Sequence, residues 1–268
     1  MALESNKSPQ DPRLGKPCSY DRDQIVSDLC AFYHFLPHIE TRIVHSAPPD
    51  GWPQITSATL ALHGIHKTAE AVDLLRHLPY LDGPRPWIAI SAFACDYRIV
   101  GEQIDARTKP GWLYDAAEEQ WPPWVVQLTT GRDREGHCYV LDTTDGTIAR
   151  HCASGIHSQY PPSYAPDDVR SWRDKLCDPE LWTLCDLLDE WRGKYRRMEF
   201  LGVPQPLSDS SNAPSLPDIY YRLPQDSPGD WCWEETEALR EIYRQHGWPD
   251  EYNRDACILA LREWWQGQ

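Results

Sequence analysis

The chain has 268 residues and a formal net charge of −15, from 26 Lys and Arg residues against 41 Asp and Glu residues. Its 41% hydrophobic and 25% charged residues are typical of a folded protein with a substantial core. The negative balance argues against a DNA partner, because phosphate binding needs a basic surface. Since no apolar run approaches the about 18 residues of a spanning helix, we also expect no membrane segment.

The first third of the chain predicts two helices. Residues 1–19 are polar and contain proline, so we expect a disordered N-terminus followed by a single domain over residues 20–268. Apolar residues then recur with the helical period over residues 21–36. A second helix is predicted over residues 68–78, with Thr68 as its N-cap.

The middle of the chain changes to a period of two, which indicates strands. Asp145-Gly146 is a hairpin turn signal between the last two runs, and we interpret Asp142 and Asp145 as turn residues without a functional role. The fold class predicted is α+β, with a central antiparallel sheet over about residues 86–151. Its strands are expected near residues 86–91, 96–100, 124–129, 137–142 and 147–151.

The last third returns to the helical period. Residues 203–231 are rich in Pro, Ser and Asp and predict a long surface crossing, in which Ile219–Tyr221 has the pattern of an edge strand. The helices expected here are residues 167–177, 180–198 after Pro179, 234–246 and 254–265.

The cysteine pattern and the sequence motifs allow predictions about the cellular location of the protein and about its cofactors. The nine cysteines form no CxxC pair and the N-terminal residues contain no apolar signal segment, so we expect reduced thiols and a cytoplasmic location. No phosphate-binding glycine loop is present, so no nucleotide cofactor is expected. His63 and His66 have the spacing of two metal ligands, but no carboxylate or Cys completes a recognisable set, and we expect no metal.

Three residues are candidates for catalysis. Ser91 ends the apolar strand WIAIS, where a serine can accept an acyl group if a base activates it, although it can equally cap a turn. Asp167 and Asp168 form the only Asp-Asp pair. Such a pair can hold a substrate guanidinium through two hydrogen bonds, and the alternative is that it caps a helix start.

Four cations lie close together near the end of the helix predicted over residues 180–198. They are Arg192, Lys194, Arg196 and Arg197. They could contact an RNA backbone, or they could stabilise the C-terminal end of the helix and pair with acids one turn back. The first interpretation makes this cluster a candidate tRNA-binding patch.

Several segments resemble a large group of filamentous-fungal proteins. The resemblance covers roughly residues 20–265 and rests on YDRDQIVSDLCAFYHFL, PPDGWPQIT, VDLLRHLPY, VQLTTGRDREGHCYVLDTTDGTI and EIYRQHGWPDEYNRDACILALREW. The activity that this resemblance implies is that of arginine-containing cyclodipeptide synthases, which join an arginyl residue to a second aminoacyl residue from charged tRNA. Those enzymes carry an Asp-Asp-x-x-Glu signature, whereas Val169, Arg170 and Ser171 follow the Asp-Asp pair here.

Residues 86–151 also resemble the Smi1/Knr4 (SUKH) group. This resemblance rests on the meander that ends in YVLDTTDGTI. Members of that group are mostly protein-interaction or immunity modules. The sequence therefore leaves two expectations: a tRNA-dependent transferase whose partner is aminoacyl-tRNA and whose product is an arginine diketopiperazine, or a non-catalytic interaction module.

Overall fold

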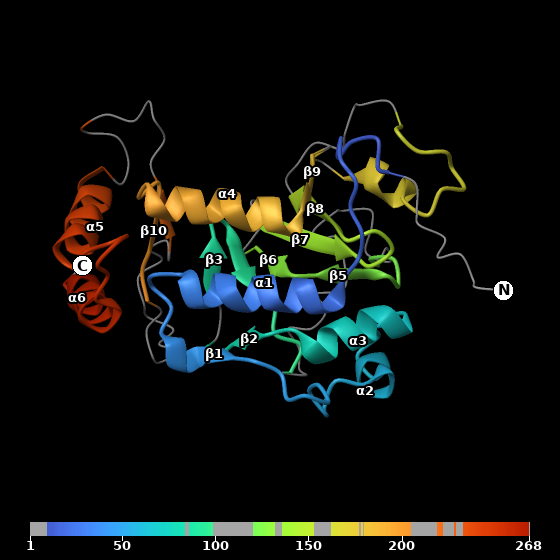
Figure 1. Ribbon diagram of the computed structural model, residues 1–268, viewed down its shortest axis with the longest axis horizontal. Helices are drawn as coiled ribbons and strands as arrows, with labels where there is room; N and C mark the ends of the chain where they lie inside the picture. Colours follow the sequence, from blue (N-terminus) through green and yellow to red (C-terminus); the bar gives the residue numbers. More distant parts are fainter. Residues whose placement is uncertain are drawn as a thin grey trace.

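In the described residues, a run of antiparallel strands from Tyr80 to Cys152 lies between N-terminal and C-terminal helices, and the fold is α+β, as the sequence predicts. Figure 1 shows helices α1 and α4 running side by side in front of the strands. Helices α5 and α6 lie at the end of the molecule near the C-terminus. The computed structural model describes residues 10–83, 86–98, 120–131, 136–152, 162–176, 178, 180–204, 219–221, 228 and 233–267.

Side-chain caps fix where most of the helices begin. Asp21, Thr68 and Asn253 each accept a hydrogen bond from the backbone N–H three residues later, which satisfies a donor that has no partner inside the helix. None of the helices in the described ranges is long and apolar enough to cross a membrane. The α-helices described are α1 (Arg22–Phe35), α2 (Ser57–Ala61), α3 (Ala69–His77), α4 (Leu184–Arg196), α5 (Trp233–Gln245) and α6 (Arg254–Gln266).

Every strand pairing described is antiparallel. The largest sheet has the order β5-β7-β8-β9, a second has the order β3-β4-β6, and the pairs β1-β2 and β10-β11 form two small sheets. The strands are β1 (Val44–His45), β2 (Tyr80–Leu81), β3 (Trp87–Ala89), β4 (Ala92–Ala94), β5 (Val125–Gln127), β6 (Thr129–Thr130), β7 (His137–Asp142), β8 (Thr147–Cys152), β9 (Leu181–Thr183), β10 (Phe200–Gly202) and β11 (Ile219–Tyr221).

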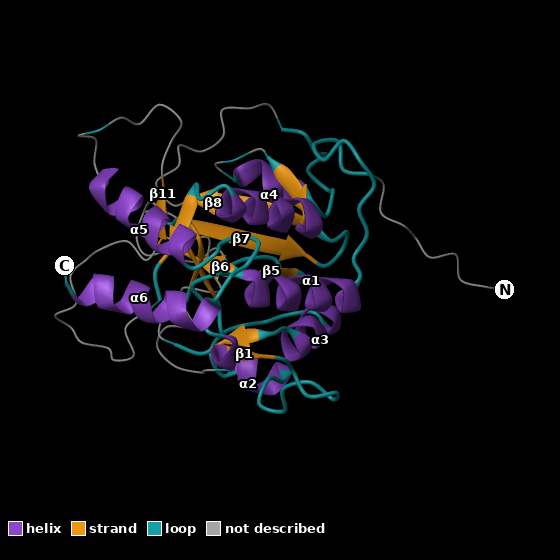
Figure 2. Ribbon diagram, turned by 60° about the vertical axis from the view of Figure 1, so that its left-hand side comes forward, coloured by secondary structure: helices purple, strands orange, loops and turns teal. Residues whose placement is uncertain are grey.

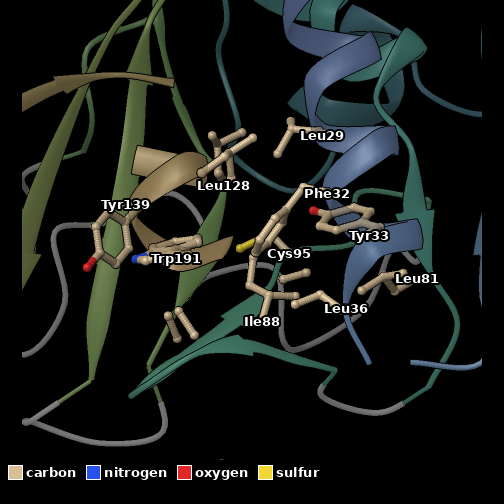
Figure 3. Packing of buried hydrophobic residues seen from close by; sticks show 14 of the residues in the cluster. Leu29, Phe32, Tyr33, Leu36, Leu81, Ile88, Cys95, Leu128, Tyr139 and Trp191 are labelled. Atoms are coloured by element: carbon tan, nitrogen blue, oxygen red, sulfur yellow. The ribbon is translucent and has the colours of Figure 1, made fainter. Parts of the chain in front are cut away.

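The main core lies between the sheets and the helix pair α1 and α4. Side chains alternate between the two faces of a strand, and Tyr139 and Leu141 of β7 point to the side of the helices. The Trp191 ring of α4 lies 4.9 Å from the Tyr139 ring and 5.7 Å from the Phe32 ring of α1. Figure 3 shows this junction, where Phe32 and its neighbours on α1 meet side chains from the strands and from α4.

The opposite face of the four-stranded sheet is also buried. Val125, Val140 and Ala149 form a second apolar cluster there with Trp121 and other side chains. Its cover comes from two irregular segments, which are the N-terminal residues 10–20, here named the strap, and a 3₁₀ turn, η3 (Ser171–Lys175). Among the described residues, apolar side chains therefore cover both faces of this sheet.

Helix α6 fastens the segment that follows α1. Arg254 donates hydrogen bonds to the backbone carbonyls of His34, Leu36 and Ile39, and the Tyr252 hydroxyl donates to the Pro37 carbonyl at 2.7 Å. Figure 2 shows α6 on the α1 side of the molecule, with α5 beside it. The C-terminal helices therefore hold the end of α1 in place.

Several expected elements differ from the structure. Residues 96–98 are not a strand, because the Asp96 carboxylate accepts a hydrogen bond from the Arg98 backbone N–H and the backbone bends there, while residues 99–100 lie outside the described residues. In place of the helix expected over residues 167–177, the structure has only the η3 turn. Leu181 lies on strand β9, so the helix expected from residue 180 begins at Leu184.

The segment expected to be disordered, residues 1–19, is described in part. Residues 1–9 lie outside the described residues, but the strap that follows them is anchored through its side chains. Asp11 is buried, Leu14 packs against the second apolar cluster, and Lys16 pairs with Asp186 at the start of α4. The charged residues of the strap thus find partners far away in the sequence.

Candidate functional site

Ser91 occupies the turn between strands β3 and β4. Its φ of 54° is left-handed, and Ala89 and Ala92 on either side of the turn pair with each other. The Ser91 carbonyl accepts a hydrogen bond from the His137 backbone N–H at 2.7 Å. Ser91 thus has the position of a turn residue.

Asp168 binds an arginine of this chain. Its carboxylate accepts hydrogen bonds from the backbone N–H and the guanidinium of Arg170, at 2.8 to 3.0 Å. These bonds lower the pKa of Asp168 to about 2. Asp167 is exposed beside it. The fork that could hold a substrate guanidinium is therefore occupied by Arg170.

The three catalytic candidates do not come together. Ser91 contacts the first residue of β7, His137, whereas the η3 turn that follows Asp168 contacts the last, Asp142, through Arg173. Because a strand rises about 3.4 Å per residue, those contacts lie roughly 17 Å apart. Ser91 and the turn that follows Asp168 thus contact opposite ends of β7.

The four cations of α4 and its C-terminus are mostly neutralised by the chain itself. Arg192 pairs with Asp189 at 2.8 Å, Lys194 with Glu190 at 2.5 Å and Arg197 with Glu199 at 2.6 Å. Within the described residues, Arg196 has no carboxylate partner, and its guanidinium lies 5.2 Å from the Phe35 ring centre. Only one of the four cations is thus left exposed without a counter-charge among the described residues.

A buried ionic network, which sequence reasoning missed, lies between the strap, η3 and the β7-β8 hairpin. Arg173 is 0% exposed and donates to Asp142 at 2.7 Å, to Asp145 at 2.9 Å and also to Asp11. Burial raises the pKa of Asp142, and the Arg173 charge opposes that shift. Asp142 and Asp145 thus bind Arg173 in addition to shaping the turn, and the network is closed to solvent.

A surface groove runs along α1. Its first wall is a stripe of α1 residues that recur with the helical period: Asp23, Val26, Ser27, Cys30, Ala31 and His34. The second wall consists of Ser46 after β1, His77 at the end of α3, and Pro79. The groove has a volume of about 590 Å³, and the Cys30 Sγ and Ser46 Oγ atoms approach to 3.5 Å across it. Small and apolar side chains thus form most of its surface.

The surroundings of the groove are acidic. Helices α1 and α3 and their capping residues carry five carboxylates against two arginines. One of those arginines, Arg22, bridges Asp23 at 2.7 Å and Asp73 at 2.8 Å. Burial raises the pKa of the nearby Tyr20 to about 12, and the charge of Asp73 adds to that shift. Carboxylates thus outnumber arginines on the two helices beside the groove.

The described residues contain no group of three His, Cys, Asp or Glu side chains arranged to bind a metal ion. The groove is thus the one feature described above that combines a hollowed surface, apolar lining and a defined charge. Comparisons with protein-family models, with curated proteins and with solved structures find no match to this chain.

Proposed function

We propose that this protein is a non-catalytic module that binds another protein through the groove between α1, β1 and α3. The observation that carries the proposal is the groove itself, which is open, lined by small and apolar side chains, and placed on a helix that the core holds firmly. Recognition surfaces of this kind use such a hollow to take apolar anchors of a partner.

The positions of the catalytic candidates favour binding over catalysis. Nucleophilic or general base catalysis needs a reactive group and its partner within hydrogen-bond distance. Ser91 lies in a turn, and Asp168 is already bound to Arg170. Neither residue borders the groove. Binding, in contrast, needs only the surface that is present.

Aminoacyl-tRNA-dependent synthesis of an arginine diketopiperazine remains a prediction of the sequence resemblance. Mass analysis of extracts from a host that expresses the protein tests it directly, since a new arginine diketopiperazine would identify the enzyme. RNA titrations of the variant with Arg196→Glu and Arg197→Glu test the tRNA partner. If these residues contact RNA, the salt dependence of binding should fall by about one unit of slope per lost phosphate contact.

Site-specific photo-crosslinking tests the proposed module. A photoreactive residue placed at Ser27 in the groove should give a discrete adduct with one protein of the native cell extract. The matched control carries the same residue at Leu259, which is 59% exposed on α6 and lies outside the groove. The captured protein, once purified, should bind the wild-type chain and lose that binding with Ala31→Trp. Equal adducts from both positions, or adducts with RNA alone, would contradict the proposal.

A further inference from the structure

The proposed function leaves the chemistry of the partner open, and the groove constrains it. We infer that the occupant is a cationic amphipathic helix of another protein, which lays its apolar face against α1 and its lysines or arginines toward the carboxylates around the groove. This inference rests on the proposed function, and it adds the secondary structure and the charge of the partner.

The length and lining of the groove fit a helix. The α1 wall extends from Asp23 to His34, which is about 16 Å at 1.5 Å per residue, or roughly three helical turns. Ala31, Cys30 and Ser27 have short side chains, so that a second helix can approach α1 closely along this stripe. A helix that binds in this way presents apolar anchors at positions i, i+3 or i+4, and i+7.

An extended peptide fits less well. It would have to pair with a strand edge, and the strand beside the groove, β1, has only two residues, Val44 and His45. Addition to so short an edge gains few backbone hydrogen bonds, whereas affinity in strand addition comes from the main chain. The geometry thus favours side-chain anchoring by a helix.

The carboxylates near the groove favour a partner with positive charge. Asp23 lies in the groove wall, and Asp73 on α3 pairs with Arg22 and with His77 of the second wall. Arg22 offsets part of this charge, but the two helices retain more carboxylates than cations. Complementary charge steers association and excludes wrong partners. A second copy of this chain is disfavoured for the same reason, because its net charge is −15.

A peptide titration with the full chain tests the inference. The probe is a fluorescently labelled helical peptide of about 14 residues, with leucines at the spacing of one helix face and lysines elsewhere. We expect saturable binding that weakens as salt rises from about 50 to about 200 mM. Two variants should each weaken binding at least about tenfold: Ala31→Trp, which fills the groove, and Asp23→Lys, which reverses a wall charge. The control Glu241→Lys changes an exposed acid of α5, outside the groove, and should leave binding unchanged.

Two further peptides separate shape from charge. A scrambled peptide with the same composition has no apolar face and should bind at least about tenfold more weakly, and an amphipathic peptide with glutamates in place of lysines should not bind. Equal binding of the scrambled peptide overturns the inference, because attraction would then be merely electrostatic. If no cationic helix binds while Ser27 still crosslinks one protein partner, the inference fails and the proposed function stands. If no cationic helix binds and Ser27 crosslinks no protein partner, the proposed function is contradicted as well.

Discussion

Two surfaces of the molecule use charge in opposite ways. On the outer face of the four-stranded sheet, the strap and η3 close over the sheet, and Arg173 is surrounded by three carboxylates that come from distant parts of the chain. Along α1, the carboxylates remain at the surface beside a groove of small side chains. In the first region the charged groups are buried within the fold, and in the second they pair at the surface, as Arg22 does with Asp23 and Asp73.

This contrast shows that a residue type suited to chemistry is not by itself a functional site. Arg173 and the aspartates on the strap side have several ionic contacts, yet they are buried and pair with one another. The groove is lined by residues without reactive groups, such as Val26 and Ala31, and it is a candidate binding site because of its hollow shape. Four substitutions can break or sharpen this contrast.

The largest effect is expected from Arg173→Met. Removing the guanidinium leaves the buried carboxylates of Asp11, Asp142 and Asp145 without their shared counter-charge, which costs about 3–5 kcal/mol for a broken buried ion pair. Urea unfolding at neutral pH measures the loss. The matched control is Arg192→Met on α4, whose pair with Asp189 lies at the surface and is worth at most about 1 kcal/mol. Equal losses in the two variants would refute a structural role for the network.

A smaller effect is expected from Gly146→Ala in the β7-β8 hairpin. Its φ of +78° strains any residue with a side chain, and an added Cβ would lie 2.6 Å from the Ser19 carbonyl oxygen of the strap. Gly64→Ala is the control, because its φ is +73° but no atom lies within 4 Å of an added Cβ. Both variants should lose about 1–3 kcal/mol through backbone strain. Only Gly146→Ala should also expose the strap to limited proteolysis.

A smaller effect still is expected from Asp168→Asn, because the contribution of Asp168 to the free energy of unfolding depends on pH. Its pKa of about 2 in the folded chain is below its ordinary value of 3.8, because Arg170 binds the ionised form. The stabilisation is therefore complete above about pH 4 and is lost as the pH falls toward 2. Asp168→Asn should cost about 1 kcal/mol near neutral pH and almost nothing near pH 2, which unfolding titrations of both proteins can compare. A constant difference at all pH values would contradict the assignment.

The groove should tolerate change best. Ala31 is exposed on α1, so Ala31→Trp should alter the free energy of unfolding by no more than about 0.5 kcal/mol, as is usual for a surface substitution. Thermal unfolding measures this value beside the binding assays described above. A large loss of stability would mean that the groove surface is part of the core, and the contrast between the two regions would disappear.

The sequence was sufficient for elements whose signals are local. Helices α1, α3, α5 and α6 were predicted because apolar period, cap and stop residue all lie within a few positions of each other, as at Thr68 and Asn253. Strand β9 was missed, and Leu181 was assigned to a helix, since its strand depends on pairing with β8. Strand β4 was missed as well, because Ala92 and Ala94 have no local strand preference.

The sites were less predictable than the fold. Arg173 and Asp11 are separated by 162 positions, and no local sequence pattern indicates that they form an ion pair. The groove walls come from α1, from the residue after β1 and from the end of α3, and each wall is unremarkable in sequence. Ser91 and Asp168 attracted interest because of their residue types, whereas their contacts depend on a turn and on Arg170.

The fastening of α1 has a consequence for biosynthesis. The strap before this helix is held by Arg173, and the segment after it is held by Arg254, which follows Leu36 by 218 positions. On the ribosome, α1 therefore emerges long before the residues that secure it, and contacts across such distances close slowly. Its apolar face, with Leu29 and Phe32, lacks the cover that Trp191 provides until α4 has been synthesised. The helix that forms one wall of the groove thus acquires its final position only after α6 has been synthesised.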